Sequence, residues 1–202
     1  MSFDHRSLLA NPHPRRHIVF PYNDEAKAIN AVHLFASSGL SKGESVVLIM
    51  TDRHSGPVIG RLAAEGLDLE ALKRAGQLEC INAAEMLQTL MPNGKLSKTI
   101  FDDTVGGLIG RARQSSPIGR VRLFGAMVTI LLESNNFSAT ERLEEMWNEV
   151  IEKHSVSLLC TYTLLASGYA KLPDSLLKLH NHDMSSWTPE DPPVHREASA
   201  ND

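Results

Sequence analysis

Five short apolar runs, separated by segments with helical periodicity, constrain the fold of this chain more than any other feature. The runs cover residues 17–21, 45–50, 77–82, 120–125 and 156–162. Most of them are nearly continuous in apolar character, which is typical of strands that are covered on both faces. We therefore predict a mostly parallel sheet of at least five strands. Its buried core is expected to contain Val47, Leu48, Phe124, Leu158 and Leu159.

The segments between the runs carry the signals with which helices begin and end. Asn23 or Asp24 precedes the first helical pattern and Gly39 lies near its end, where N-cap and C-cap residues are found. Strands that alternate with helices predict an α/β fold with helices on both faces of the sheet. The predicted helices span residues 26–40, 57–65, 68–75, 97–114, 140–153 and 173–180.

The length and composition suit a single domain. A chain of 202 residues with 42% hydrophobic residues can bury one α/β core of ordinary size. We expect a flexible N-terminal segment at residues 1–16 and one domain at residues 17–182. From residue 183 to residue 202 the chain is rich in Ser, Pro, Asp, Glu and Asn, a composition typical of a disordered tail.

Charge and hydropathy exclude several classes of partner. The net charge is -4 and no block of Lys and Arg occurs, so we expect no direct contact with nucleic acid. No run approaches 18 uninterrupted apolar residues, and the first 16 residues lack an apolar signal segment, so we expect a cytoplasmic protein without membrane contact. Cys80 and Cys160 each lie inside an apolar run and are expected to be buried thiols.

The carboxyl ends of the predicted strands indicate where a ligand binds, because open parallel sheets bind ligands at that edge. The residues there mix polar tips with apolar side chains, as small-molecule pockets do. We expect Tyr22, Asp52, His54 and Tyr162 to converge on one cavity. Helix capping remains the alternative role for the polar residues that follow strands. The predicted ligand-binding residues are Tyr22, Asn23, Asp52, His54, Asn82, Met127 and Tyr162.

Motifs for nucleotide hydrolysis and covalent catalysis are missing. The turn after the first strand, residues 21–26, contains no glycine and two carboxylates, whereas a phosphate-binding loop needs glycine-rich backbone and a lysine. No GxSxG sequence is present, so a nucleophile elbow is excluded as well. We predict no catalytic residues, no cofactor and no enzymatic activity.

Metal ligation has one local candidate in the sequence. His180, His182 and Asp183 have a spacing that suits weak binding of zinc or nickel. No further ligand is evident, so we predict no metal site. His33 is expected to be a packed core histidine, and the pair Glu144 and Glu145 is expected on a solvated helix surface.

Several stretches, taken in order, resemble the MEDS family, the methanogen/methylotroph DcmR sensory domains. Residues 17–22 (HIVFPY) and an acidic helix start resemble the family's opening, and residues 39–49 are similar both to its second-strand approach and to RecA/KaiC-like ATPases. Residues 75–78 (AGQL), 124–127 (FGAM) and 159–162 (LCTY) resemble later family motifs. Together the likeness covers about residues 15–180.

The resemblance implies a three-layer, RecA-like fold without a phosphate-binding loop, and a sensory role. Ala126 replaces an acidic residue that is usual in the family, and the 16 residues before His17 are too few for a helix-turn-helix. We therefore interpret the chain as a stand-alone sensory or adaptor domain. It is expected to bind a small-molecule effector and to signal to a histidine kinase or regulator protein in two-component or transcriptional regulation. The alternatives are a degenerate nucleotide-binding protein without hydrolysis and a homo-oligomeric scaffold.

Overall fold

The computed structural model describes residues 5–164 and 171–187. Its centre is a six-stranded sheet in which every pair of neighbouring strands is parallel. The strands are β1 (His17–Tyr22), β2 (Ser45–Met50), β3 (Leu78–Asn82), β4 (Val121–Gly125), β5 (Ser157–Thr163) and β6 (His182–Asp183). Their order across the sheet is β3-β2-β4-β5-β1-β6, so the five predicted strands are confirmed and a sixth is added.

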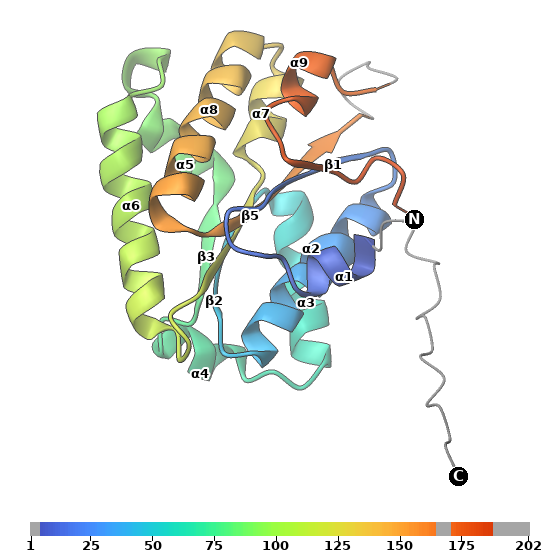
Figure 1. The fold of residues 1–202 in the computed structure, drawn as a ribbon, viewed down its shortest axis with the longest axis vertical. Helices are drawn as coiled ribbons and strands as arrows, with labels where there is room; N and C mark the ends of the chain where they lie inside the picture. The colour runs from blue at the N-terminus through green and yellow to red at the C-terminus, as the bar shows by residue number, and fades with distance from the viewer. Residues whose placement is uncertain (1–4, 165–170, 188–202) are drawn as a thin grey trace.

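Helices cover both faces of this sheet, which produces three layers (Figure 1). The helices of the described residues are α1 (His5–Ala10), α2 (Glu25–Ser41), α3 (Asp52–Ala64), α4 (Leu69–Arg74), α5 (Ala83–Leu90), α6 (Lys98–Ser115), α7 (Met127–Glu133), α8 (Phe137–His154) and α9 (Asp174–Leu177), with a 3-10 turn at Pro92–Gly94. Helices α1, α2 and α3 lie on one face, and α5, α6, α7 and α8 lie toward the other (Figure 1). The predicted three-layer α/β fold is confirmed.

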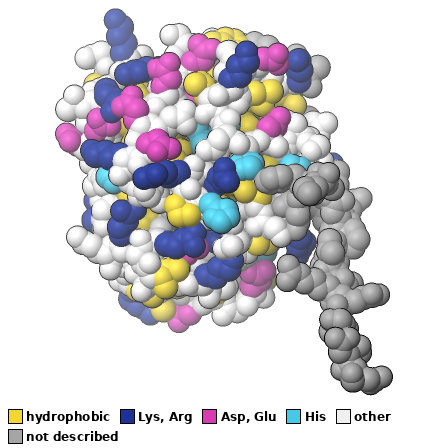
Figure 2. All heavy atoms as spheres, in the orientation of Figure 1, with side chains coloured by type: hydrophobic (Ala, Val, Ile, Leu, Met, Phe, Trp, Pro, Cys, Tyr) yellow, Lys and Arg dark blue, Asp and Glu magenta, His cyan; other side chains and the backbone are white. Residues whose placement is uncertain are grey.

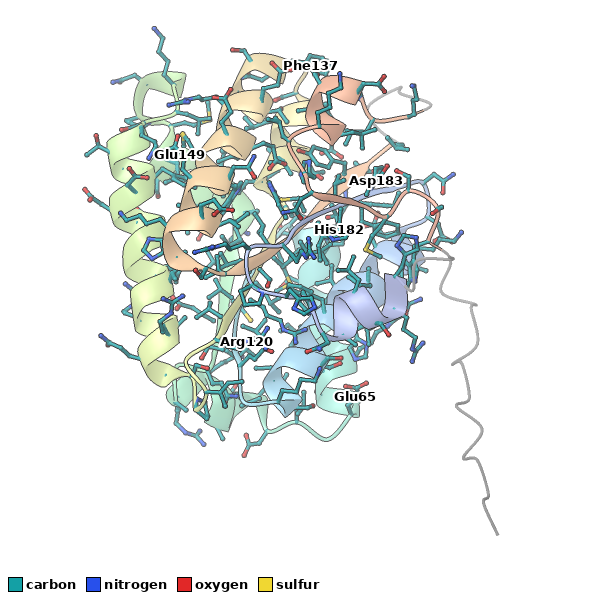
Figure 3. The ribbon with its side chains drawn as sticks, in the orientation of Figure 1. Glu65, Arg120, Phe137, Glu149, His182 and Asp183 are labelled. Atoms are coloured by element: carbon teal, nitrogen blue, oxygen red, sulfur yellow. The ribbon has the colours of Figure 1, made fainter. Side chains whose placement is uncertain are left out.

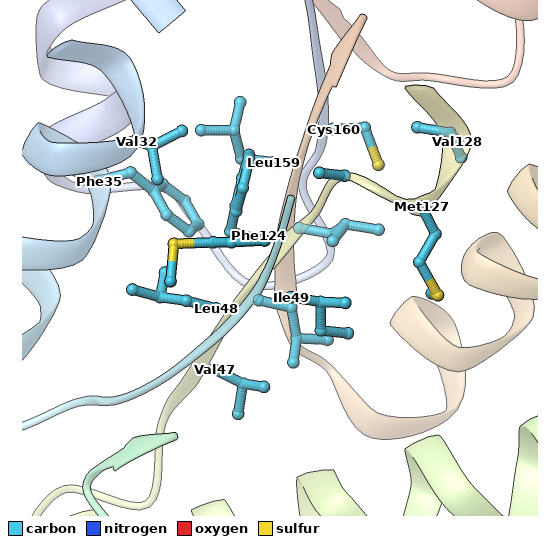
Figure 4. Packing of buried hydrophobic residues seen from close by; sticks show 14 of the residues in the cluster. Val32, Phe35, Val47, Leu48, Ile49, Phe124, Met127, Val128, Leu159 and Cys160 are labelled. Atoms are coloured by element: carbon cyan, nitrogen blue, oxygen red, sulfur yellow. The ribbon is translucent and has the colours of Figure 1, made fainter. Parts of the chain in front are cut away.

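Side chains along each strand alternate between the two helical layers. Leu159 points toward Val32 and Phe35 of α2, whereas its neighbour Cys160 points to the opposite side of β5 (Figure 4). This alternation is the ordinary period of two in a strand. Both directions are buried in β1, β2, β4 and β5, so these four strands have no solvent-exposed face. All five side chains predicted for the core are fully buried: Val47, Leu48, Phe124, Leu158 and Leu159.

The N-terminal segment is held by a buried arginine. Arg122 of β4 donates hydrogen bonds to the carbonyl oxygens of Leu9 and Ala10 at 3.0 and 3.2 Å, and Leu9 is fully buried. The expectation of a flexible segment at residues 1–16 therefore does not hold for α1. Gly39 is not a helix stop either, because α2 continues to Ser41. A Cβ atom at Gly39 would lie 2.9 Å from Cδ and Nε of Arg122, so glycine makes room for the guanidinium.

The C-terminal part of the described chain also differs from the prediction. Helix α9 is shorter than the predicted helix at residues 173–180, and the short strand β6 follows it beside β1 (Figure 3). Met184 and Trp187 are buried, and the Trp187 ring packs edge-on against Phe20 with centroids 5.3 Å apart. The expected tail thus begins with packed residues, and residues 188–202 lie outside the described part of the chain.

Three further expectations concern the surface. Cys160 is buried as predicted, but Cys80 is exposed because β3 is an edge strand. His33 is not a core residue, since its partly exposed ring lies 3.2 Å from the Glu65 carboxylate.

On the face shown in Figure 2, acidic and basic side chains are interspersed. None of the helices in the described residues has the length and apolar character needed to cross a bilayer.

Candidate functional site

A cavity of about 290 Å³, which we call the rim cavity, lies at the carboxyl edge of the sheet. Its lining comes from the ends of β1, β2 and β3 and from the beginnings or sides of α3, α5 and α7. The lining residues are Tyr22, Thr51, Asp52, Arg53, Asn82, Ala84, Thr129, Ile130 and Glu133. The rim cavity therefore occupies the edge at which open parallel sheets bind ligands.

Two strand ends turn directly into helices at this edge, which places their polar side chains in the lining. The side-chain oxygen of Asn82 accepts hydrogen bonds from the backbone N–H groups of Ala84 and Glu85 at 2.9 and 3.2 Å, and so caps α5. The amide nitrogen of Asn82 donates to Asp52 Oδ1 at 3.0 Å. Asp52 is the first residue of α3, where the positive end of the helix dipole stabilises a carboxylate.

An ion pair crosses the lining between α3 and α7. Nη1 of Arg53 donates to Oε1 of Glu133 at 2.9 Å, and this carboxylate raises the pKa of Arg53. The cation of Arg53 is therefore already engaged. The lining contains two acidic groups, Asp52 and Glu133, and one basic group, Arg53. This excess of negative charge disfavours a polyphosphate and suits an uncharged ligand.

His54 lies behind Tyr22 and is fully buried. Its Nε2 is 3.4 Å from the Tyr22 hydroxyl and 3.0 Å from Oε1 of Glu25, and its Nδ1 is 3.4 Å from Oγ1 of Thr51. Burial, together with the positive charge of Arg53, lowers the pKa of His54 to about 4. Burial also raises the pKa of Tyr22 above its ordinary value. At neutral pH the two side chains below the rim cavity, the His54 imidazole and the Tyr22 phenol, are therefore both uncharged.

The structure brings together some of the predicted ligand-binding residues and separates others. Tyr22, Asp52 and Asn82 line the rim cavity, and His54 contacts Tyr22 from behind. Asn23 is exposed beside the cavity and Met127 is buried in the core, so neither is part of the lining. Their role in binding, like that of the others, stays a prediction. Thr51, Arg53 and Thr129 also line the cavity; they follow predicted strands but are outside the predicted ligand-binding set. The remaining lining residues, Ala84, Ile130 and Glu133, were not predicted.

Tyr162 lies on the other face of the sheet. Tyr162 pairs with Pro21 in the register of β1 and β5, one residue before Tyr22, and side chains one residue apart point to opposite faces. The Tyr162 hydroxyl donates to Oε1 of Glu144 on α8. The expectation that Tyr22 and Tyr162 share one cavity is therefore wrong.

Glu144 is part of a second polar site, which is buried against the sheet. Its carboxylate lies 3.1 Å from Nε2 of His17 and 3.3 Å from Nε2 of His180, with Cys160 Sγ 3.9 Å away. The expectation of a solvated carboxylate holds for Glu145 but not for Glu144, which is fully buried. The helical spacing in the sequence indicates this burial, because Glu144 lies with Leu143 and Trp147 on a largely apolar face of the helix.

The local candidate for metal ligation is divided by the fold. His180 belongs to the buried site, whereas His182 lies on β6 and lines a different cavity together with Arg16. Side chains two residues apart point the same way only within a continuous strand. The turn after α9 breaks that relationship, so His180 and His182 do not form one site.

Comparisons with other proteins agree with this architecture. The sequence profile described as MEDS (MEthanogen/methylotroph, DcmR Sensory domain) matches residues 16–181. Among solved structures, the chain is similar to a KaiC-like protein from the hyperthermophilic archaeon Pyrococcus horikoshii OT3, with a TM-score of 0.59 and 12% sequence identity, over 84% of this chain and 70% of that protein. This likeness confirms the RecA/KaiC-like fold and concerns the fold alone. No sequence of a curated protein matches the chain.

Proposed function

The chain belongs to the MEDS family of sensory domains, and we propose that it senses a small, weakly polar organic effector in the rim cavity and signals through protein contacts. The observation that carries the proposal is the cavity of about 290 Å³ at the carboxyl edge of the sheet. That volume lies at the lower end of the range of about 300–1,000 Å³ that is usual for ligand pockets. A small molecule is therefore the occupant that fits.

The lining supports an effector with one polar end. Ala84 and Ile130 supply apolar contact, and the carboxylate of Asp52 supplies hydrogen-bond acceptors, whereas the buried Thr129 hydroxyl already donates to the Thr161 carbonyl and the Tyr22 hydroxyl faces His54. A few polar groups among apolar ones orient a small ligand and provide specificity. Because the pKa values of Tyr22 and His54 leave both groups neutral at physiological pH, the cavity does not require a charged effector.

The helices that contribute to the lining indicate how effector binding is transmitted through the protein. Arg53 at the start of α3 and Glu133 at the end of α7 are joined by an ion pair at the cavity. An effector that binds between these helices changes the free energy of that contact, and differential affinity for two arrangements is what shifts a conformational equilibrium. The exposed side of α3 is the part of the molecule that a histidine kinase or regulator protein would contact, since no residue of α7 is exposed.

Nucleotide hydrolysis is not part of the proposed function. The turn between β1 and α2 contains Asn23, Asp24 and Glu25, and Asp24 uses its carboxylate to accept a hydrogen bond from the Ala26 N–H at 2.9 Å. These groups oppose a phosphate electrostatically instead of surrounding it with free N–H donors. Without the electrostatic stabilisation that such loops supply, phosphoryl transfer loses its main source of catalysis.

A ligand screen tests the proposal. The purified chain is melted in the presence of small alcohols, amides, aldehydes and halogenated hydrocarbons, and separately with ATP, ADP and a cyclic nucleotide, because a ligand that binds the native state raises the melting temperature. We expect stabilisation by members of the first group only. Stabilisation by nucleotides alone would favour the degenerate nucleotide-binding protein.

Two tryptophan variants locate the binding. Ala84 is exposed and lines the rim cavity, so Ala84→Trp fills the cavity, while Ala63→Trp places the same side chain at an exposed position on α3 away from the lining. We expect the stabilisation by ligand to disappear in Ala84→Trp and to persist in Ala63→Trp. Persistence in both variants would contradict binding in the rim cavity.

A further inference from the structure

Four potential metal ligands lie buried between the sheet and α8, and none of them lines the rim cavity. The imidazoles of His17 and His180, the carboxylate of Glu144 and the thiol of Cys160 each place one atom within 4.8 Å of all the others. Their side chains are at most 1% exposed. They come from β1, α8, β5 and the segment after α9, so the fold brings four distant parts of the chain together at this point.

Hydrogen bonds on the outer side of both imidazoles determine which ring nitrogen faces the cluster. The amide nitrogen of Asn148 donates to the Leu179 carbonyl at 2.8 Å, which turns its Oδ1 toward Nδ1 of His17 at 2.8 Å. Nδ1 of His180 lies 2.8 Å from the carbonyl oxygen of Leu176. An oxygen acceptor at each Nδ1 requires the proton on that nitrogen, so neutral rings direct both Nε2 lone pairs into the cluster.

In that state both Nε2 lone pairs point at the oxygens of the Glu144 carboxylate, so hydrogen-bond acceptors face one another. The Glu144 carboxylate lies 3.1 Å from Nε2 of His17 and 3.3 Å from Nε2 of His180, and it accepts a hydrogen bond from the Tyr162 hydroxyl. Nε2 of His180 is buried and has no hydrogen-bond partner among the described residues, although Glu144 Oε1 is 3.3 Å away. Protonation of both rings leaves a net positive charge in the core, which burial disfavours.

The donor set and its spacing fit a zinc ion. Imidazole nitrogen, thiolate sulfur and carboxylate oxygen are the ordinary ligands of tetrahedral zinc, and bonds of about 2.0–2.3 Å separate neighbouring ligand atoms by about 3.4–3.7 Å. Here Nε2 of His17 is 3.1 Å from Oε2 of Glu144 and 3.6 Å from Sγ of Cys160. Sγ of Cys160 is 3.9 Å from Oε2 of Glu144. Zinc with one thiolate and one carboxylate has no net charge, which suits the buried position.

We propose that His17, Glu144, Cys160 and His180 bind one structural zinc ion. All four positions of the ion are filled by the protein, which is the mark of a structural rather than a catalytic zinc site. Coordination removes the proton of the Cys160 thiol, which passes to solvent as zinc binds. The hydroxyl of Tyr162 donates to Oε1 of Glu144 and orients the carboxylate, as outer hydrogen bonds do in metal sites.

The ion fastens the C-terminal part of the domain to its centre. His180 follows α9 directly and precedes β6, which pairs with β1 through only Ile18 and Val19. A bond from His180 to a metal shared with β5 and α8 fixes this short element. The inference is independent of the rim cavity, because none of its four residues lines that cavity.

Cobalt spectroscopy tests the site directly. Because the ligands are closed to solvent, the purified chain is unfolded with a chelator, refolded with Co²⁺ and freed of unbound metal. We expect one cobalt ion per chain, a thiolate-to-cobalt charge-transfer band and the intense d–d absorption of four-coordinate cobalt, all lost on displacement by zinc. A chain that refolds without retaining metal, or that retains cobalt without the thiolate band, overturns the proposal.

The two cysteines provide a matched pair of variants. Cys160→Ser removes the buried thiol and Cys80→Ser removes the exposed one. The charge-transfer band should disappear in Cys160→Ser and remain in Cys80→Ser, and the reverse pattern or a band in both variants overturns the assignment. Should Cys160→Ser fail to fold, His180→Gln carries the test, with His33→Gln as its control. We expect at least about a tenfold loss of cobalt affinity in His180→Gln and none in His33→Gln.

Discussion

The guanidinium of Arg122 and the carboxylate of Glu44 lie side by side in the core, joined by hydrogen bonds of 2.6 Å from Nε to Oε2 and 3.0 Å from Nη2 to Oε1. Arg122 is completely buried and Glu44 is 1% exposed. The remaining donors reach backbone carbonyls of α1 and α2, among them those of Leu9 and Phe35 at 3.0 Å. One side chain thus satisfies a buried carboxylate and attaches two helices to β4.

Arg122→Met is expected to destabilise the protein by about 3–5 kcal/mol, because it leaves the Glu44 carboxylate buried without its partner. The double variant Glu44→Gln with Arg122→Met should recover a substantial part of this loss, since it removes the unpaired charge. Urea denaturation measures both free energies of unfolding. Arg142→Ala is the control, because its ion pair with Glu145 is half exposed and is worth at most about 1 kcal/mol. Equal losses for Arg122→Met and Arg142→Ala would contradict this account.

His54 gives the stability a predictable dependence on pH. Its pKa is about 4 in the folded protein and about 6.5 in an unfolded chain. Between these values the unfolded chain binds a proton that the folded protein does not, so stability falls as the pH is lowered from about 6.5 toward 4, by about 3 kcal/mol from this group. Burial raises the pKa of the neighbouring Glu25, which opposes part of this loss.

Removal of the imidazole isolates its share of the pH dependence. In His54→Gln, the free energy of unfolding measured between pH 7 and pH 4 should decline less steeply than in the unmodified protein. His33→Gln changes a partly exposed histidine that faces Glu65 and should leave the slope nearly unchanged. Parallel curves for His54→Gln and the unmodified protein would show that His54 does not resist protonation in the fold.

Asn82 is predicted to contribute stability as a helix cap. Its side-chain oxygen serves the backbone N–H groups of Ala84 and Glu85, and loss of such a cap costs about 1 kcal/mol. Asn82→Ala should lose about this amount in urea denaturation, whereas Asn82→Ser should keep most of it because serine also caps helices. Equal losses in the two variants would mean that the capping oxygen is not what matters at this position.

The presence of five parallel strands was predictable because most of them are nearly continuous apolar runs, and β1, β2, β4 and β5 are buried on both faces. Helices α5 and α7 were not, since each is short and begins directly at a strand end, at Ala83 and Met127. Asn82, the N-cap of α5, is also the last residue of the preceding strand, and α7 has no side-chain cap, so the apolar residues of both helices continue the preceding run. Helix α1 was also missed, because its attachment depends on Arg122, more than 100 residues away in the sequence.

The site was predictable as an edge of the sheet but not as a set of side chains. Tyr22, Asp52 and Asn82 were found because the carboxyl ends of parallel strands identify them. Tyr162 was misplaced because the face on which it lies depends on the register between β1 and β5, which pairs it with Pro21. The sequence does not show that register, nor which residues of β1 and β5 the inward-facing Glu144 contacts.

Binding of a small effector in the rim cavity is tested most directly by methyl NMR of the isoleucines. Ile130 lines the rim cavity, whereas Ile118 is exposed and precedes β4, at the opposite edge of the sheet. On titration with the compound that raises the melting temperature most, we expect the Ile130 methyl signals to shift in a saturable way and the Ile118 signals to stay in place. Saturable shifts at Ile118 with none at Ile130 would contradict the rim cavity as the sensory site.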